Sequence, residues 1–120
     1  MTHEFEIRDD GIGRLVPIGD QDKEDVENFR KDMEPLLEAA TEAEPARLLV
    51  DSSRSGKTSS AGRKMYVELS RDPRIGKTAV VKARRYSRLL ATFVIKATGR
   101  DDICFFDSEE EALAWLKAES

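Results

Sequence analysis

With 120 residues, the chain is long enough for one domain with a single core and too short for a second domain of ordinary size. Its residues are 39% hydrophobic and 37% charged, a composition typical of folded domains rather than disordered chains. No run of about 18 apolar residues occurs, so the sequence predicts no membrane-spanning helix. The single cysteine, Cys104, excludes an internal disulfide and a cysteine-based zinc site, and we expect a reducing, cytoplasmic compartment.

Charge is distributed unevenly along the chain. Residues 1–51 contain 15 acidic and 6 basic residues, a net charge of −9. Residues 52–100 contain 2 acidic and 13 basic residues (+11), and residues 101–120 contain 7 acidic and 1 basic residue (−6). Such asymmetry indicates a polarised surface or an anionic partner. The alternative is that the oppositely charged segments pack beside one another and neutralise locally.

The first third of the chain predicts a β-hairpin followed by a long helix. Residues 5–8 and 14–18 are strand-like, turn residues lie between them, and Pro17 places the second strand at a sheet edge or ends it. Asp22 and Asp25 suit a helix N-terminus. Pro35 predicts a kink or break near residues 33–34, because a mid-helix proline costs about 3 kcal/mol. Three- and four-residue spacing predicts one buried face: Val26, Phe29, Met33, Leu36, Leu37 and Ala40.

The rest of the chain alternates strands and helices. Short apolar runs predict strands at residues 46–50, 78–81 and 103–106, and residues 52–58 form a polar loop. Helical patterns cover residues 60–70 and 85–98, and the capping box at Ser108 and Glu111 opens a last helix. Crossover helices between strands predict an α/β fold, with a mixed, partly parallel sheet of four to five strands and about four helices.

No motif predicts catalysis, a metal or a cofactor. Gly56-Lys57-Thr58 resembles the end of a phosphate-binding loop, but Asp51 stands where that motif requires glycine. His3 is the only histidine and lies near a terminus that we expect to be mobile, so the serines at 52–60 have no evident base. Cys104, inside an apolar strand, is expected to be a small buried hydrophobe. We therefore predict a non-enzymatic protein without a cofactor.

The helix at residues 85–98 has an apolar stripe and a basic flank. Its stripe consists of Tyr86, Leu89, Leu90, Phe93 and Ala97. We expect Phe93 and Phe105 to lie in the core rather than to stack on bases, so nucleic-acid binding is not indicated. Ile95 falls roughly opposite Tyr86, beside Arg84 and Arg88, where it is either a contact to a membrane surface or partner or one tolerated exposed isoleucine.

Two motifs carry a resemblance to a known family. The strand ending in Asp51, the polar loop and the helix start Ser59-Ser60-Ala61-Gly62 resemble the STAS domain of the sporulation anti-sigma factor antagonists and the broader SpoIIAA-like proteins. The signature of that family is an apolar strand ending in Asp or Asn, a short loop, and D-S-S-G at a helix start. Residues 106–116 resemble the SpoIIAA-like F-D-x-x-E-x-A-x-x-W-L helix. The resemblance implies one STAS-like domain over residues 1–120.

The resemblance also implies a function. In the antagonists, the first serine of D-S-S-G is phosphorylated by a partner kinase that is also the anti-sigma factor. That serine aligns with Ser60, whereas Ser59 replaces the aspartate and Ala61 replaces the second serine. The implied role is a non-enzymatic module that binds a protein in a partner-switching-like pathway, with Ser60 as the phosphorylation position.

Elementary electrostatics favours the binding of an anion at this helix start. Helix N-termini favour anions, and the candidate loop, partner or anion-binding residues are Lys57, Thr58, Ser59, Arg63 and Lys64. The alternative is that Ser59 and Ser60 act only as helix caps. A second function from another class follows from the similarity of SpoIIAA-like proteins to lipid-carrier domains. It is a carrier or sensor of a small or lipid-like ligand that associates with membranes through Arg84, Arg85, Arg88 and Ile95.

Overall fold

The computed structural model describes residues 2–118, which form a five-stranded sheet with a smaller two-stranded sheet at its side. The strand order in the large sheet is β1-β2-β4-β6-β7, and β3 pairs with β5 in the small sheet. The strands are β1 (His3–Ile7), β2 (Gly13–Pro17), β3 (Gly19–Gln21), β4 (Ala46–Asp51), β5 (Ser55–Thr58), β6 (Ile75–Val81) and β7 (Ile103–Phe106). The helices are α1 (Lys23–Glu38), α2 (Ser60–Ser70), α3 (Arg85–Thr98) and α4 (Glu109–Lys117).

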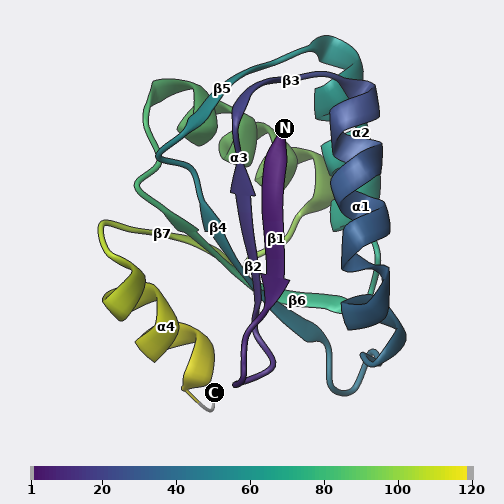
Figure 1. Ribbon diagram of the computed structural model, residues 1–120, viewed down its shortest axis with the longest axis vertical. Coiled ribbons are helices and arrows are strands. Elements are labelled where there is room, and N and C mark those ends of the chain that lie inside the picture. The colour runs from purple at the N-terminus through teal and green to yellow at the C-terminus, as the bar shows by residue number, and fades with distance from the viewer. Residues whose placement is uncertain (1, 119–120) are drawn as a thin grey trace.

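The predicted α/β fold class is confirmed. β1 and β2 form the expected antiparallel hairpin, whereas β2, β4, β6 and β7 run parallel to one another. Each parallel connection passes through a helix, because parallel strands need a long crossover. Figure 1 shows α1 and α2 side by side on one side of the sheet and α4 on the other.

Each face of the sheet has its own apolar core. The α1 and α2 face buries the larger cluster, which includes Leu15, Val26, Phe29, Met33, Leu36, Leu37, Leu48 and Leu69. The α4 face buries Ile12, Leu49, Ala79, Val81, Ala112 and Leu116. Alternation along β4 divides the two cores, since Leu48 faces one side and Leu49 the other.

The start of α1 is as predicted, but the helix does not break near residues 33–34. Asp22 caps the helix, and Asp25 completes a capping box by accepting the Asp22 amide at 2.8 Å. The helix continues through Pro35 to Glu38. Pro35 removes one backbone hydrogen bond, and burial of Met33 and Leu37 favours the helical conformation on both sides of it.

Two other expectations are corrected near the N-terminal half of the sheet. Part of the predicted polar loop is the strand β5, which pairs in parallel with β3. The lack of apolar residues in Ser55–Thr58 hid this strand, which depends on backbone pairing and on the Lys57 amide donating to Asp20 at 2.8 Å. His3 is not in a mobile terminus, because it lies in β1 with its ring 5.7 Å from that of Phe29.

Candidate functional site

The N-terminus of α2 is held by a hydrogen-bond network that joins it to the start of α1. The Ser59 hydroxyl accepts the Gly62 amide at 3.0 Å and donates to the Asp22 carboxylate at 2.5 Å. The Ser59 amide in turn donates to the Gln21 carbonyl. The Ser59 hydroxyl and the Lys23 amide together hold the pKa of Asp22 below its usual value. Ser59 is therefore a helix cap that positions Ser60 beside it.

Gly62 is required by close packing rather than by an unusual backbone angle. A Cβ at this position would lie 2.9 Å from the Thr58 methyl group, 3.2 Å from the Ser59 hydroxyl and 3.3 Å from the Gln21 carbonyl. The glycine lets the first turn of α2 approach β3 and β5. This contact gives a physical reason for the last position of the D-S-S-G pattern.

Ser60 is exposed and is contacted by a cation. The Arg63 guanidinium donates to the Ser60 hydroxyl at 3.1 Å from the next turn of the helix. Lys57, Arg63 and Lys64 are also exposed, in agreement with the predicted basic neighbourhood. Thr58 differs from that prediction, because it is half-buried in β5 and packs toward Gly62.

The apolar stripe predicted for α3 faces outward, which corrects the expectation that Phe93 lies in the core. Tyr86, Leu89 and Phe93 are 44%, 62% and 44% exposed. Leu90 of the predicted stripe turns inward, where it lines a cavity beneath the helix together with Ala91 and Val94. The apolar residues of the helix form one broad arc, and the pattern alone does not reveal which edge of that arc is buried.

Ile95 and its basic neighbours are also placed differently from the prediction. Ile95 is half-buried rather than an exposed residue among cations. Arg84 caps the helix without a side-chain hydrogen bond, and the Arg85 guanidinium lies 5.9 Å from the Tyr86 ring. Arg88 covers the ring of Phe105 at 4.7 Å. These three arginines are exposed, so the basic flank is present, with the half-buried Ile95 beside it.

Cations from β5 and α2 lie over the exposed aromatic rings of α3. The Lys57 ammonium lies 5.4 Å from the centroid of the Tyr86 ring, and the Arg63 guanidinium lies 5.9 Å from that of Phe93. The predicted loop and helix candidates thus form one continuous area. We call it the basic–aromatic surface, and it consists of Lys57, Ser60, Arg63, Tyr86, Leu89 and Phe93.

The positive charge of this area is not neutralised by the acidic segments. Within residues 2–118, no carboxylate lies within ion-pair distance of the following cations: Lys57, Arg63, Lys64, Arg84, Arg85 and Arg88. Of the ion pairs in that part of the chain, the one between Arg54 and Glu4 joins the basic middle segment to the first acidic segment. Part of the predicted polarisation is therefore present, as exposed cations around α2 and α3 without ion pairs, whereas Arg54 and Arg100 of the same segment pair with carboxylates of the two acidic segments.

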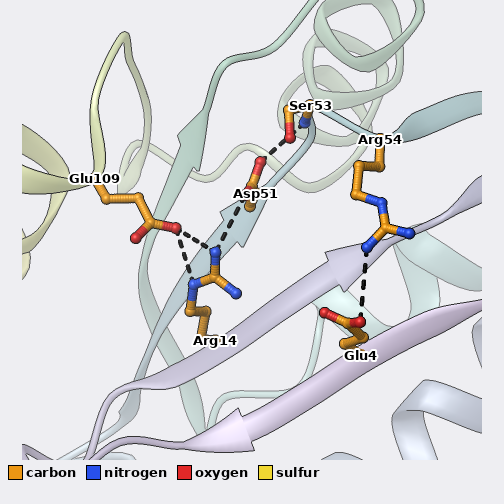
Figure 2. Close-up of polar contacts among 6 residues, drawn as sticks. All are labelled: Glu4, Arg14, Asp51, Ser53, Arg54 and Glu109. Carbon is orange, nitrogen blue, oxygen red and sulfur yellow. Dashed lines mark hydrogen bonds and ion pairs between the residues drawn. The ribbon is translucent and has the colours of Figure 1, made fainter.

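A cluster of ion pairs on the α4 face was missed by the sequence reasoning. The Arg14 guanidinium donates to Glu109 at 2.5 and 2.9 Å and to Asp51 at 3.2 Å (Figure 2). Asp51 also accepts the Ser53 amide at 2.9 Å. Burial raises the pKa of Asp51, but the hydrogen bonds from Ser53 and the charge of Arg14 outweigh it and lower the pKa overall. The cluster attaches the start of α4 to β2 and β4 and is a structural feature. Its only signal in the sequence was the aspartate that ends a buried strand.

An apolar cavity of about 110 Å³ lies between α3 and the sheet. Its walls include Leu15, Leu48, Val50, Val80, Leu90, Ala91 and Val94. Gln21, only 3% exposed, also lines it, and its side-chain oxygen has no hydrogen-bond partner among residues 2–118. A cavity of this size and polarity suits a small, largely apolar molecule.

Comparison with known proteins gives a family. A family model described as SpoIIAA-like matches residues 17–117. The chain belongs to the SpoIIAA-like family. No curated protein matches its sequence.

The fold recurs in solved structures of low sequence identity. An uncharacterised protein with a SpoIIAA-like fold from Shewanella loihica superimposes with a TM-score of 0.75 at 18% identity, over 95% of this chain and 93% of that one. The anti-sigma factor antagonist SpoIIAA in its unphosphorylated form gives 0.68 at 16% identity, over 98% and 99%. A putative anti-sigma factor antagonist from Thermotoga maritima gives 0.67 at 18% identity, over 96% and 94%. These similarities confirm the SpoIIAA-like fold of the chain.

Among residues 2–118, no three His, Cys, Asp or Glu side chains are grouped so as to hold a metal ion. None of the four helices in that range is both long and apolar enough to cross a membrane.

Proposed function

We propose that this SpoIIAA-like chain is a non-enzymatic regulatory module that binds a protein partner through the basic–aromatic surface. One observation carries the proposal: exposed apolar side chains on α3 lie beside cations that form no ion pair among residues 2–118, next to an exposed serine at the start of α2. Grouped exposed apolar residues that are flanked by charge typically mark an interaction site. The anti-sigma factor antagonists with the same fold support a protein as the partner.

Charge and shape define the partner. The uncompensated cations around α3 favour an acidic protein surface, because complementary charge accelerates encounter and fixes orientation. Tyr86, Leu89 and Phe93 follow one stripe of the helix, which is the arrangement that packs against an apolar stripe on another helix. An acidic amphipathic helix on a protein partner satisfies both requirements.

Ser60 is the proposed regulatory position of this surface. A kinase would transfer the terminal phosphoryl group of ATP to the Ser60 hydroxyl oxygen, releasing the hydroxyl proton and ADP. Phosphoserine carries about −1.5 to −2 charges at neutral pH and is stabilised by cations such as Lys57, Arg63 and Lys64. It also reduces the net positive charge of the surface, so we expect it to weaken the binding of an acidic partner. The need for ATP is consistent with a cytoplasmic location.

Affinity capture from the organism of origin tests the proposal. Tagged wild type, Ser60→Glu and Ser60→Gln are purified from cells, and both the co-purified proteins and phosphate at Ser60 are quantified by mass spectrometry. The proposal predicts phosphate at Ser60 and an acidic protein that is retained by the glutamine variant and lost by the glutamate variant. Absence of phosphate together with equal capture by all three proteins would overturn it.

The cavity beneath α3 favours a second candidate, a carrier or sensor of a small or lipid-like ligand. The cavity is lined mainly by apolar side chains, and the outer face of the same helix is apolar and bordered by Arg84, Arg85 and Arg88. This arrangement suits a helix that contacts an anionic membrane while covering a ligand. Native mass spectrometry and sedimentation with phosphatidylglycerol vesicles test it. A bound small molecule or salt-dependent sedimentation would support this candidate, and the absence of both would eliminate it.

A further inference from the structure

Arg63 contacts both the proposed regulatory serine and the exposed face of α3. One nitrogen of its guanidinium donates to the Ser60 hydroxyl at 3.1 Å, while the guanidinium carbon lies 5.9 Å from the centroid of the Phe93 ring. Within residues 2–118 no carboxylate lies within ion-pair distance of this side chain. The position of Arg63 is therefore set by two weak, solvent-exposed contacts.

A negative charge at residue 60 changes the balance between these two contacts. The present contact with Ser60 is a hydrogen bond to a neutral hydroxyl, and the contact with Phe93 is a cation–π interaction at an exposed site. Hydrogen bonds between two charged groups are roughly twice as strong as neutral ones, and a guanidinium binds phosphate through two nitrogens at once. Binding a phosphate through two nitrogens requires the planar group to turn from its present orientation, in which it touches both the Ser60 hydroxyl and the ring.

We propose that Arg63 couples the charge of residue 60 to the exposed apolar face of α3. A phosphate on Ser60 withdraws the guanidinium from Phe93, so the ring loses its covering cation while the surface loses positive charge. The two states of Ser60 then present two different surfaces at the same place. The proposal rests on the proposed function only in taking Ser60 as the residue that acquires the charge.

The test is NMR of the free protein with phosphoserine incorporated at position 60. The matched control is the same sample after phosphatase treatment. The proposal predicts that phosphate moves the side-chain Nε–Hε signal of Arg63 and the ring signals of Phe93 together. In Arg63→Gln, the ring signals lose their response to phosphate. In Phe93→Leu, the Arg63 signal shifts less on phosphorylation, because the shielding by the ring is already absent.

Two results would overturn the coupling. One is a Phe93 ring that does not respond to phosphate in the otherwise wild-type protein, and the other is a response of equal size in Arg63→Gln. Because no partner is present in this experiment, its outcome is separate from that of the affinity capture. If the partner is captured but the ring does not respond to phosphate, the proposed function stands and Arg63 is refuted as the link. If the ring responds but no partner is captured, the coupling stands and the proposed function is refuted.

Discussion

Substitution of Gly62 by alanine should destabilise the protein, although alanine is the better helix former. Alanine favours a helix interior over glycine by roughly 0.5–1 kcal/mol. The added Cβ, however, would lie 2.9 Å from the Thr58 methyl group and 3.3 Å from the Gln21 carbonyl, and a backbone carbonyl has little freedom to move. Overpacking of this kind typically costs about 1–3 kcal/mol. We expect a net loss of about 1–2 kcal/mol in the free energy of unfolding.

Chemical denaturation monitored by circular dichroism measures this change directly. Thr58→Ser removes the methyl group at 2.9 Å, so the double variant Thr58→Ser/Gly62→Ala should recover part of the loss. The same methyl deletion in the wild-type background should be neutral or slightly destabilising. A Gly62→Ala protein more stable than wild type would refute the close approach of α2 to β3 and β5, and with it the geometry that positions Ser60.

The other predictions concern the helix cap, the buried ion pairs and the outward face of α3. Ser59→Ala should cost about 1 kcal/mol of stability and raise the pKa of Asp22 toward its ordinary value, as measured by denaturation and by NMR titration. An unchanged pKa of Asp22 would contradict the hydrogen bond from Ser59. Asp51→Asn should be less stable than wild type at pH 7 by about 1 kcal/mol, a small value because the pair with Arg14 is partly solvent-screened. Since the folded pKa of Asp51 is lowered, the difference should shrink as the pH falls below about 4, and a pH-independent difference would refute the charge interaction. Leu89→Asp should leave the denaturation midpoint almost unchanged because Leu89 is 62% exposed, and a large loss of stability would show that it is buried.

Strong local signals made most of the fold predictable. The carboxylates at the start of α1, the Ser108 cap of α4, the helical patterns of α2 and α3 and the apolar runs of β4, β6 and β7 correspond to the observed elements. The strand β5 was missed because its stability comes from backbone pairing with β3, which residue type does not reveal. The helix at Pro35 persists because tertiary packing around it outweighs the local preference.

The candidate site was predictable in composition but not in arrangement. Ser60, Lys57 and Arg63 are close in the chain, so their proximity followed from sequence alone. The meeting of Lys57 and Arg63 with Tyr86 and Phe93 depends on the docking of α3 beside α2 and β5. The orientation of α3 about its own axis depends on which of its residues fit the narrow space that faces the sheet. The broad apolar pattern of the helix does not specify that orientation.

The most direct test of the proposed binding surface is the dissociation constant of the captured partner for two surface variants. Leu89→Asp removes an apolar contact at the centre of the basic–aromatic surface. It also places there a negative charge, which repels an acidic partner. Ile7→Asp makes the same chemical change at a residue that is 48% exposed at the end of β1, an edge strand of the sheet that is not part of this surface. We predict that Leu89→Asp weakens binding by at least about tenfold, whereas Ile7→Asp leaves it unchanged. Equal affinities of wild type and Leu89→Asp would contradict the proposal that this surface binds the partner.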